Sequence, residues 1–509
     1  MKWNTVILLL IFKGSLSFGQ TSLDEIDLEN GAFRVGFRHY ITADSTRTYQ
    51  RIYDWNNRSI PRPIPVSIWY PSTDHPTETE ALTVLDYMQV LKEEEEWEYL
   101  PDEQILNWFY YPNTPENRAH LQEVTTAHSG LSSANGAFPA LIYAPSYQAS
   151  SIENFALCEY LASHGYIVIS SPSRGAENRF FDGGTGKDME AQARDIEFLL
   201  AEVAKVPAAN LDQIATIGFS YGGLSNVLAQ MRNEQIKAIV SLDGSIKYQY
   251  ETLKQSPFFN LENVDVPFIH FAQKNIPDEV LMAEKIDPSL NNTFEFYDEL
   301  IKSNAYSLKF HNLSHSYFST LGVLFQPRDK RQDKSDPEIM ESYKWVSHYT
   351  LRFLDAYLKG DDQALIFINN TTSENNILEE LVSYRSKQAE RQALSFQDFN
   401  ELASAKNYQN LIDLYQLTLN DYPELKLPEG NLNNLGLQLL FNPETSEKGL
   451  NIFLLATYLY PESANLFDSL GEAYLFVGEN EKAIENFEKS LELYPENQNA
   501  RDRLKQLRN

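Results

Sequence analysis

Residues 218–223 read Gly-Phe-Ser-Tyr-Gly-Gly, and the serine among them is the residue best placed to do chemistry. They follow the apolar run 214–217 and precede 224–231, which has the spacing of a helix. A Gly-x-Ser-x-Gly turn between a strand and a helix is the setting of a nucleophile elbow, in which the serine sits on a strained turn. Gly218 and Gly222 leave the room that such a turn requires. The pattern predicts that Ser220 is a nucleophile.

A serine hydroxyl needs a neighbouring base, and in this kind of site the base is a histidine later in the chain. His270 lies in the middle of an apolar strand pattern and is expected to pack inside the sheet. His311 ends a predicted strand, whereas His315 lies in the loop that follows it. A loop beyond the carboxyl end of a strand is where a base can reach the nucleophile. We therefore predict His315 as the base, with His311 as the alternative.

The base in turn needs an acid that orients it, and two aspartates follow predicted strands. Asp243 comes directly after the apolar run 239–242 and is followed by Gly244, which permits a sharp turn. Asp278 follows the next predicted strand at a greater distance. We predict Asp243 as the acid and keep Asp278 as the alternative; either could instead be a turn or helix-capping residue.

An oxyanion hole requires two backbone N–H groups, one of which belongs to the residue after the nucleophile. That residue is Tyr221, and the second donor is expected from the loop 145–150. Pro145 has no N–H, so Tyr147 or Ser146 must donate. The sequence shows no spacing typical of metal ligands and no phosphate-binding loop, so we expect neither a metal nor a cofactor.

The elements that must position these residues alternate between strand and helix. Strands are predicted at 66–70, 139–144, 166–170, 214–217, 238–242, 268–272 and 306–310, with helices at 154–164, 188–205 and 343–358. This order predicts an α/β fold with a mostly parallel sheet covered by helices on both faces, over residues 20–362. Residues 77–135 interrupt it with acidic and aromatic helical sequence and are expected to cap one end of the sheet, where their aromatic side chains either line a pocket or pack the insertion down.

The C-terminal part reads differently. Residues 363–394 are expected to be a linker, and 395–509 a wholly helical array. Gly471, Tyr474, Ala483, Phe487 and Pro495 fall at the spacings of a tetratricopeptide repeat, and Pro461 precedes Pro495 by one such period. Small residues in such repeats let paired helices approach closely.

Composition and the N-terminus bear on location and partners. Residues 1–19 combine one early lysine, a short apolar core and small residues near position 19, which predicts a secretory signal peptide and an exported, periplasmic or secreted protein. We expect no membrane span in the mature chain. The formal net charge of −29 argues against nucleic acid as a partner. The single cysteine, Cys158, lies in an apolar helical pattern and is expected in the core.

Residues from about 30 to 360 resemble the α/β-hydrolases of the platelet-activating-factor acetylhydrolase and dienelactone hydrolase group. The resemblance rests on the stretches 68–71, 161–166, 218–223, 242–244 and 314–318. It implies an ester hydrolase, with Asp243 as the acid as in the acetylhydrolase branch. The family usually has His-Gly where this chain has Pro145-Ser146, so Tyr147 is assigned to the oxyanion hole only by its place in the loop.

The prediction is an exported serine hydrolase that cleaves small carboxylic esters with short acyl groups through an acyl-enzyme. The motif around Ser220 also resembles prolyl oligopeptidase-type serine peptidases, but no β-propeller repeat precedes it. A third interpretation is an inactive hydrolase fold that acts as an interaction protein, binding a protein or peptide partner through its repeats.

Overall fold

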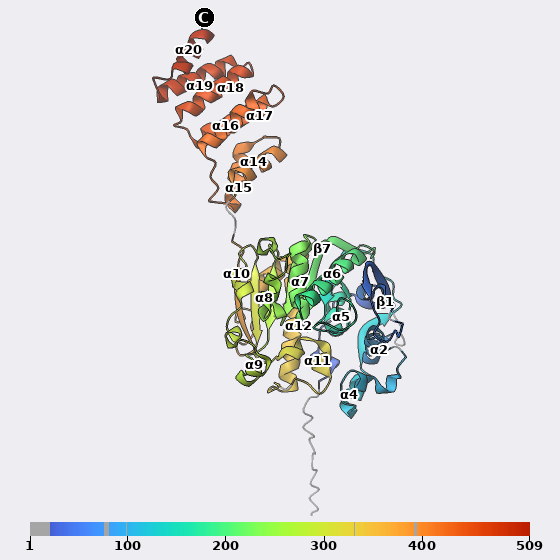
Figure 1. Ribbon diagram of the computed structural model, residues 1–509. Coiled ribbons are helices and arrows are strands. Elements are labelled where there is room, and N and C mark those ends of the chain that lie inside the picture. The colour runs from blue at the N-terminus through green and yellow to red at the C-terminus, as the bar shows by residue number, and fades with distance from the viewer. Residues whose placement is uncertain are drawn as a thin grey trace, which may run out of the picture. The chain divides into compact units, whose positions relative to one another are not determined.

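The computed structural model describes residues 21–56, 58–75, 81–97, 99–329, 331–390 and 394–508 (Figure 1). The chain divides into two compact units, Met1–Glu390 and Arg391–Asn509. The predicted signal peptide, residues 1–19, lies outside the described residues. Within the described part of the chain, no helix is both long enough and apolar enough to cross a membrane.

The first unit is built on one eleven-stranded sheet with the order β11-β10-β9-β8-β7-β5-β6-β2-β1-β4-β3. Six neighbouring strands, from β10 to β6 in this order, run parallel. β2 joins β6 antiparallel, and β1 joins β2 antiparallel over a long register with one bulge. The strands are β1 Arg34–Tyr49, β2 Ile60–Ser72, β5 Phe138–Ala144, β6 Ile167–Ser170, β7 Ala209–Phe219, β8 Ile236–Leu242, β9 Phe268–Ala272 and β10 Ala305–Phe310.

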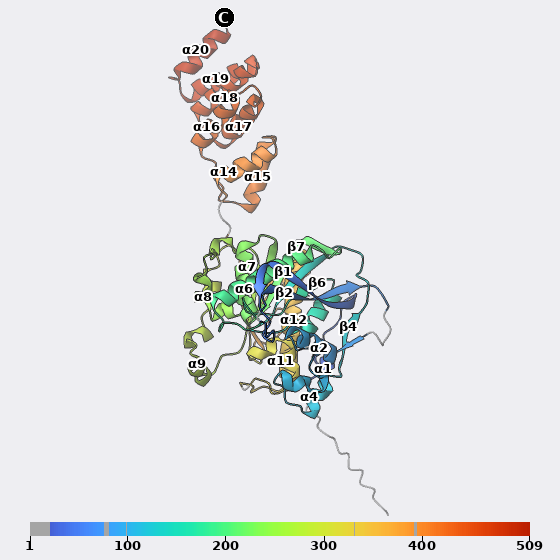
Figure 2. The same ribbon diagram turned by 45° about the vertical axis from the view of Figure 1, so that its right-hand side comes forward.

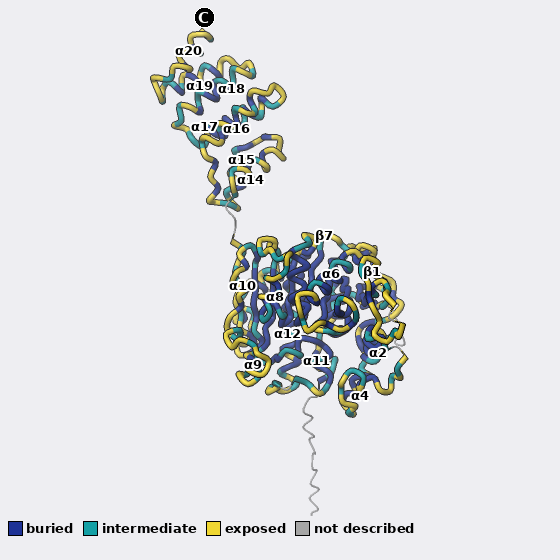
Figure 3. The backbone as a smooth tube through the Cα atoms, in the orientation of Figure 1, coloured by how far each residue is buried: buried dark blue, intermediate teal, exposed yellow. Residues whose placement is uncertain are grey.

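Helices cover both faces of this sheet because alternate side chains of each parallel strand are apolar on both sides. Leu141 and Tyr143 of β5 pack with α5 and α12, whereas Ala140 and Ile142 pack with α6 and α7. The buried residues lie in the interior of this unit, in the strands and in the faces of the helices that cover them (Figure 3). The covering helices are α1 Leu23–Ile26, α5 Phe155–Ser163, α6 Gly186–Val203, α7 Tyr221–Arg232, α8 Tyr250–Lys254, α9 Asp278–Glu284, α10 Glu295–Glu299, α11 Thr320–Leu324 and α12 Asp336–Leu358. This is an α/β-hydrolase-like fold, as the alternation predicted.

The predicted insertion at 77–135 is not purely helical. It contains α2 Val84–Glu94, α3 Ile105–Trp108 and α4 Pro115–His120, and also β3 Ala81–Thr83 and β4 Val124–Ser129. β4 pairs parallel with β1, and β3 pairs antiparallel with β4. Both views place α2 beside α4 at one end of the unit (Figures 1 and 2). The insertion therefore extends the sheet edge as well as covering it.

The range 363–394, predicted as a linker, is largely structured. α13 Asp362–Asn369 contacts α12, and β11 Val382–Lys387 pairs antiparallel with β10 from Ala305 to Phe310. β11 was missed because its exposed edge position leaves Arg385 and Lys387 among few apolar residues, so its alternation is weak. The boundary between the two units falls at Glu390.

The second unit is a series of paired helices, as predicted. Its helices are α14 Phe396–Ala405, α15 Leu411–Asp421, α16 Glu429–Leu440, α17 Ser446–Leu459, α18 Ala464–Phe476, α19 Asn480–Leu493 and α20 Gln498–Leu507. A side chain at Gly436 would meet the Phe453 ring at 2.6 Å, and one at Gly471 would meet the Phe487 ring at 2.7 Å. Two successive pairs thus use the same glycine–phenylalanine contact to bring their helices together.

Candidate active site

Ser220 occupies the turn between β7 and α7 with φ 52° and ψ −118°. A non-glycine residue with positive φ is held there only when its surroundings fix it. Here the Ser220 N–H donates to the carbonyl of Leu242, and the Ser220 carbonyl accepts from Ser245 and Gly223. The strained turn therefore points the Ser220 hydroxyl away from the strand.

The two glycines of the motif are required by close contacts. A Cβ at Gly222 would lie 2.1 Å from the carbonyl oxygen of Ala144, and a Cβ at Gly218 would lie 2.4 Å from Nδ2 of Asn226. Any side chain at these positions would displace either the neighbouring strand end or the helix. The small residues thus let the loop after β5 approach the nucleophile.

The structure brings Ser220, His315 and Asp243 together at the carboxyl ends of β7, β10 and β8. His315 Nε2 lies 2.9 Å from Ser220 Oγ, and His315 Nδ1 lies 2.6 Å from Asp243 Oδ2. A carboxylate only accepts, so Nδ1 carries the proton and Nε2 is free to accept from the serine hydroxyl. The His315 ring also lies 5.2 Å, between centroids, from the ring of Phe219.

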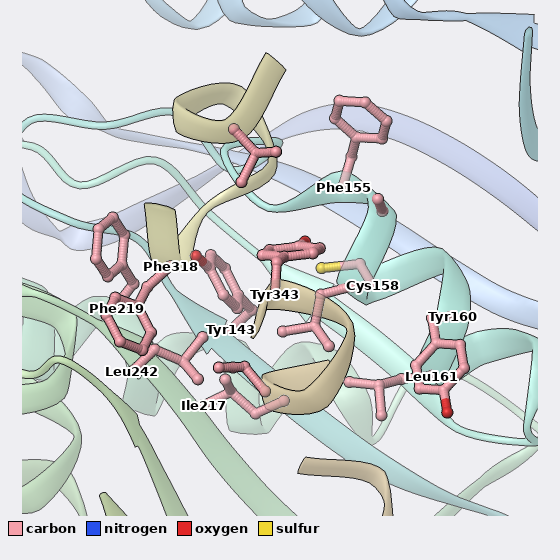
Figure 4. Close-up of a cluster of buried hydrophobic side chains, with 14 of the residues drawn as sticks. Tyr143, Phe155, Cys158, Tyr160, Leu161, Ile217, Phe219, Leu242, Phe318 and Tyr343 are labelled. Carbon is pink, nitrogen blue, oxygen red and sulfur yellow. The ribbon is translucent and has the colours of Figure 1, made fainter. Parts of the chain in front are cut away.

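One hydrophobic cluster anchors all three turns. Phe219 precedes Ser220, Leu242 precedes Asp243, and Phe318 closes the short 3-10 helix His315–Phe318. Figure 4 shows these three side chains in the buried cluster that also holds Cys158, which is in the core as predicted. Because protein interiors are close-packed, the three functional groups share one rigid support.

Asp243 is fully buried, and its partners keep it ionised. Burial alone would raise the pKa of Asp243, but the hydrogen bond and the charge interaction with His315 lower it below its ordinary value. The Gln273 N–H and the Tyr248 hydroxyl donate to its other oxygen at 3.1 and 3.2 Å. A carboxylate with this many donors is held in one orientation.

The alternatives considered for base and acid lie elsewhere. His311 Nε2 lies 2.7 Å from the hydroxyl of Ser383 on β11, and His270 is buried with its Nδ1 2.9 Å from the hydroxyl of Ser241. Burial lowers the pKa of His270 to about 3, so this ring is neutral. Asp278 is exposed at the start of α9. The structure therefore places neither His311 nor Asp278 in the cluster around Ser220.

Two backbone N–H groups are candidates for the predicted oxyanion hole. Tyr221 is the first residue of α7, and the N–H of that position has no acceptor within its own helix. Of the two candidates after β5, the Ser146 N–H already donates to Glu153 Oε2 at 2.9 Å. This leaves Tyr147 as the candidate donor of that loop.

Glu153 was not predicted from the sequence, since an acidic residue just before a helix is ordinary. It is buried, and Ser146 donates to it with both its N–H and its hydroxyl, the latter at 2.5 Å. Its own carbonyl accepts from the N–H of Leu321 in α11, 3.2 Å away. Burial raises the pKa of Glu153 to about 7, although Ser146 and His315 act to lower it. Glu153 thus ties the loop after β5 to the segment that follows His315.

A second buried carboxylate supports the same loop from the insertion. Glu94, at the end of α2, is buried and accepts from the Ser151 N–H at 3.0 Å and from the hydroxyls of Ser150 and Ser151. Glu94 belongs to the run of four glutamates at 93–96, in the acidic helical sequence predicted for the insertion. It holds the loop that contains the candidate oxyanion donor Tyr147.

We predict that Glu153 makes stability depend on pH in a way that Glu153→Gln removes. A carboxyl group with a pKa of about 7 in the folded chain and 4.5 otherwise stabilises the fold below about pH 4.5 and loses that contribution as pH rises to about 7. The difference in the free energy of unfolding, variant minus wild type, should therefore rise by about 3 kcal/mol as the pH is raised from about 4 to 8. Urea unfolding of both proteins across this range measures it; a pH-independent difference would contradict it.

A cavity of about 650 Å³ adjoins this cluster. His315, Phe219, Ser146 and Glu153 contribute to its lining, and the insertion contributes aromatic side chains. Among the described residues, no group of His, Cys, Asp and Glu side chains is arranged to hold a metal ion.

Comparison with known proteins found one matching family model. The family model for X-Pro dipeptidyl-peptidase (S15 family) matches residues 109–266, a range that includes Ser220 and Asp243 but not His315. Among solved structures, the chain is similar to a ferulic acid esterase from Streptomyces cinnamoneus, at 18% identity and a TM-score of 0.47, over 70% of this chain and 98% of that one. No curated protein matches the sequence.

The likeness to the platelet-activating-factor acetylhydrolase and dienelactone hydrolase group stays a prediction, as does the assignment of the helical pairs in the second unit to tetratricopeptide repeats. The S15 match and the fold support a hydrolase of the serine-hydrolase kind.

Proposed function

We propose that this chain is an esterase that hydrolyses small carboxylic esters with short acyl groups by means of Ser220, His315 and Asp243. The observation that carries the proposal is the pair of contacts from His315, 2.9 Å to Ser220 Oγ and 2.6 Å to Asp243 Oδ2. A base within hydrogen-bond reach of a serine, itself oriented by a buried carboxylate, is what nucleophilic catalysis requires.

In this mechanism the Ser220 oxygen attacks the acyl carbon while His315 Nε2 takes its proton. The negative charge that develops on the acyl oxygen is stabilised by the N–H groups of Tyr221 and Tyr147. His315 then returns the proton to the leaving alcohol, which departs and leaves an acyl-enzyme. A water molecule, activated by the same histidine, releases the acid and restores Ser220.

A serine peptidase is the second candidate, because the matching family model describes an X-Pro dipeptidyl-peptidase. An enzyme that removes dipeptides must bind the positive N-terminus of its substrate, for which a carboxylate is the natural partner. Of the described residues, two carboxylates line the cavity, and both are engaged: Glu95 with Arg179, and Glu153 with Ser146. This arrangement favours an ester over a peptide as the substrate.

The two candidates are separated by offering the purified full chain an ester and an amide. We expect kcat/KM for p-nitrophenyl acetate to exceed that for glycyl-prolyl-p-nitroanilide by at least about 100-fold, with Ser220→Ala as the blank for both. A higher value for the anilide would favour the peptidase. Turnover of neither substrate, nor of esters with longer acyl groups, would favour a hydrolase fold that serves only as an interaction protein.

We also propose that the chain is exported and that its second unit consists of tetratricopeptide-type repeats that bind a protein or peptide partner. The first proposal is supported by the sequence pattern of residues 1–19. The second is supported by the equivalent contacts of Gly436 with Phe453 and of Gly471 with Phe487 in successive helix pairs.

A further inference from the structure

The cavity wall is rich in aromatic rings. Five of them come from the insertion, namely Trp97, Trp108, Phe109, Tyr110 and Tyr111, and Tyr53, Phe180 and Phe219 come from other segments. The larger aliphatic residues in the lining are only Leu91 and Leu321 among the described residues. A cavity built for an alkyl chain is lined mainly by aliphatic side chains, so this composition points to a flat ligand.

Three of these rings form a fixed stack with the guanidinium group of Arg179. The rings of Phe109 and Trp97 are stacked with centroids 5.8 Å apart. The guanidinium carbon of Arg179 lies 4.8 Å from the centre of the Trp97 ring and 4.7 Å from that of Phe180. Each member is therefore oriented by its neighbours before any ligand arrives.

Hydrogen bonds hold the stack in place. Arg179 is buried, and its Nη1 donates to the carbonyl of Glu95 at 2.6 Å and pairs with the Glu95 carboxylate. Trp97 Nε1 donates to the hydroxyl of Tyr53 at 3.1 Å. Yet Trp97, Trp108 and Phe109 remain only partly buried, and Tyr110 and Phe180 are exposed. Leaving this much apolar ring surface open to water is unfavourable unless a ligand covers it.

Residues of the candidate active site line the same cavity. His315, Ser146 and Glu153 belong to its lining along with the rings. We propose that the insertion forms a subsite for an aromatic group, so that the substrate is an ester carrying an aromatic ring in its alcohol or its acid part. The hydrolysis of such an ester rests on the proposed esterase function, whereas the binding of its ring rests on the stack alone.

The test compares matched esters that differ only in the ring. Benzyl acetate is compared with cyclohexylmethyl acetate, and methyl phenylacetate with methyl cyclohexylacetate, using wild type, Trp97→Leu and Trp108→Leu. Contacts between aromatic rings should give wild type a kcat/KM about three- to tenfold higher for the aromatic ester than for the saturated ester in one of the two comparisons. That comparison identifies which part of the ester enters the subsite. In the two variants this ratio should fall towards one.

Trp55→Leu is the matched control, because Trp55 is 93% exposed and does not line the cavity. It should keep the wild-type ratio. Equal kcat/KM within both pairs for wild type, or an unchanged ratio in both Trp97→Leu and Trp108→Leu, would overturn the subsite.

A binding measurement separates failure of the subsite from failure of the proposed reaction. Saturation-transfer NMR on Ser220→Ala should show benzyl alcohol bound and cyclohexylmethanol bound more weakly, with the difference lost when Trp97→Leu is added. Ring binding without hydrolysis of any ester would retain the subsite and reject the esterase. No preference for the ring in this measurement would reject the subsite, whether or not esters are hydrolysed.

Discussion

Replacing Ser220 by Ala should lower kcat for p-nitrophenyl acetate by about 10⁵- to 10⁶-fold. The variant lacks the hydroxyl that His315 Nε2 contacts at 2.9 Å, so no acyl-enzyme can form. A residual rate above that in water would come from the oxyanion donors and from binding alone. Stopped-flow or steady-state release of p-nitrophenol measures the loss.

The control is Ser133→Ala, since Ser133 is exposed and lies in a loop between β4 and β5. It should retain wild-type kcat, and both variants should keep the wild-type melting temperature within a few degrees. A Ser220→Ala protein that still produces a burst of p-nitrophenol would show that another residue is the nucleophile.

Asp243→Asn should lower kcat by about 10⁴-fold at neutral pH. The asparagine amide would donate a hydrogen bond to His315 Nδ1, where the carboxylate accepts one. The imidazole proton would then lie on Nε2, which faces Ser220 and could no longer take the serine proton. KM should change far less than kcat, because Asp243 is fully buried and does not line the cavity. Steady-state kinetics on a short-chain ester give both values.

Asp278→Asn is the paired test of the alternative acid. Because Asp278 is exposed at the first turn of α9, its substitution should leave kcat within about twofold of wild type. Loss of activity in Asp278→Asn with a normal Asp243→Asn would reverse the assignment.

The sequence located the nucleophile turn and its partners because each follows a strongly apolar strand. β7, β8 and β10 are buried on both faces, and such runs are visible as continuous hydrophobic stretches. Their parallel arrangement puts their carboxyl ends at one edge, where Ser220, Asp243 and His315 meet.

What the sequence did not reveal depends on contacts between distant segments. Glu94 and Glu153 are buried because serines from the loop after β5 satisfy their oxygens, and no local pattern distinguishes such glutamates from surface ones. The stack of Arg179 on Trp97 joins residues from α6's preceding loop and from the insertion, so neither segment alone predicts it. Side-chain partners far apart in the chain are set by the tertiary fold.

The pairing of β11 with β10 has a consequence for where the catalytic unit can be cut. A chain ended after α12, at the boundary the sequence indicated, would lack the partner of all six residues from Ala305 to Phe310. The backbone of β10 would then become a bare sheet margin able to recruit the same strand of another molecule. In the full chain, the charged side chains Arg385 and Lys387 of the edge strand β11 disfavour such pairing between molecules. The shortened enzyme would therefore be prone to aggregate even with its active site intact.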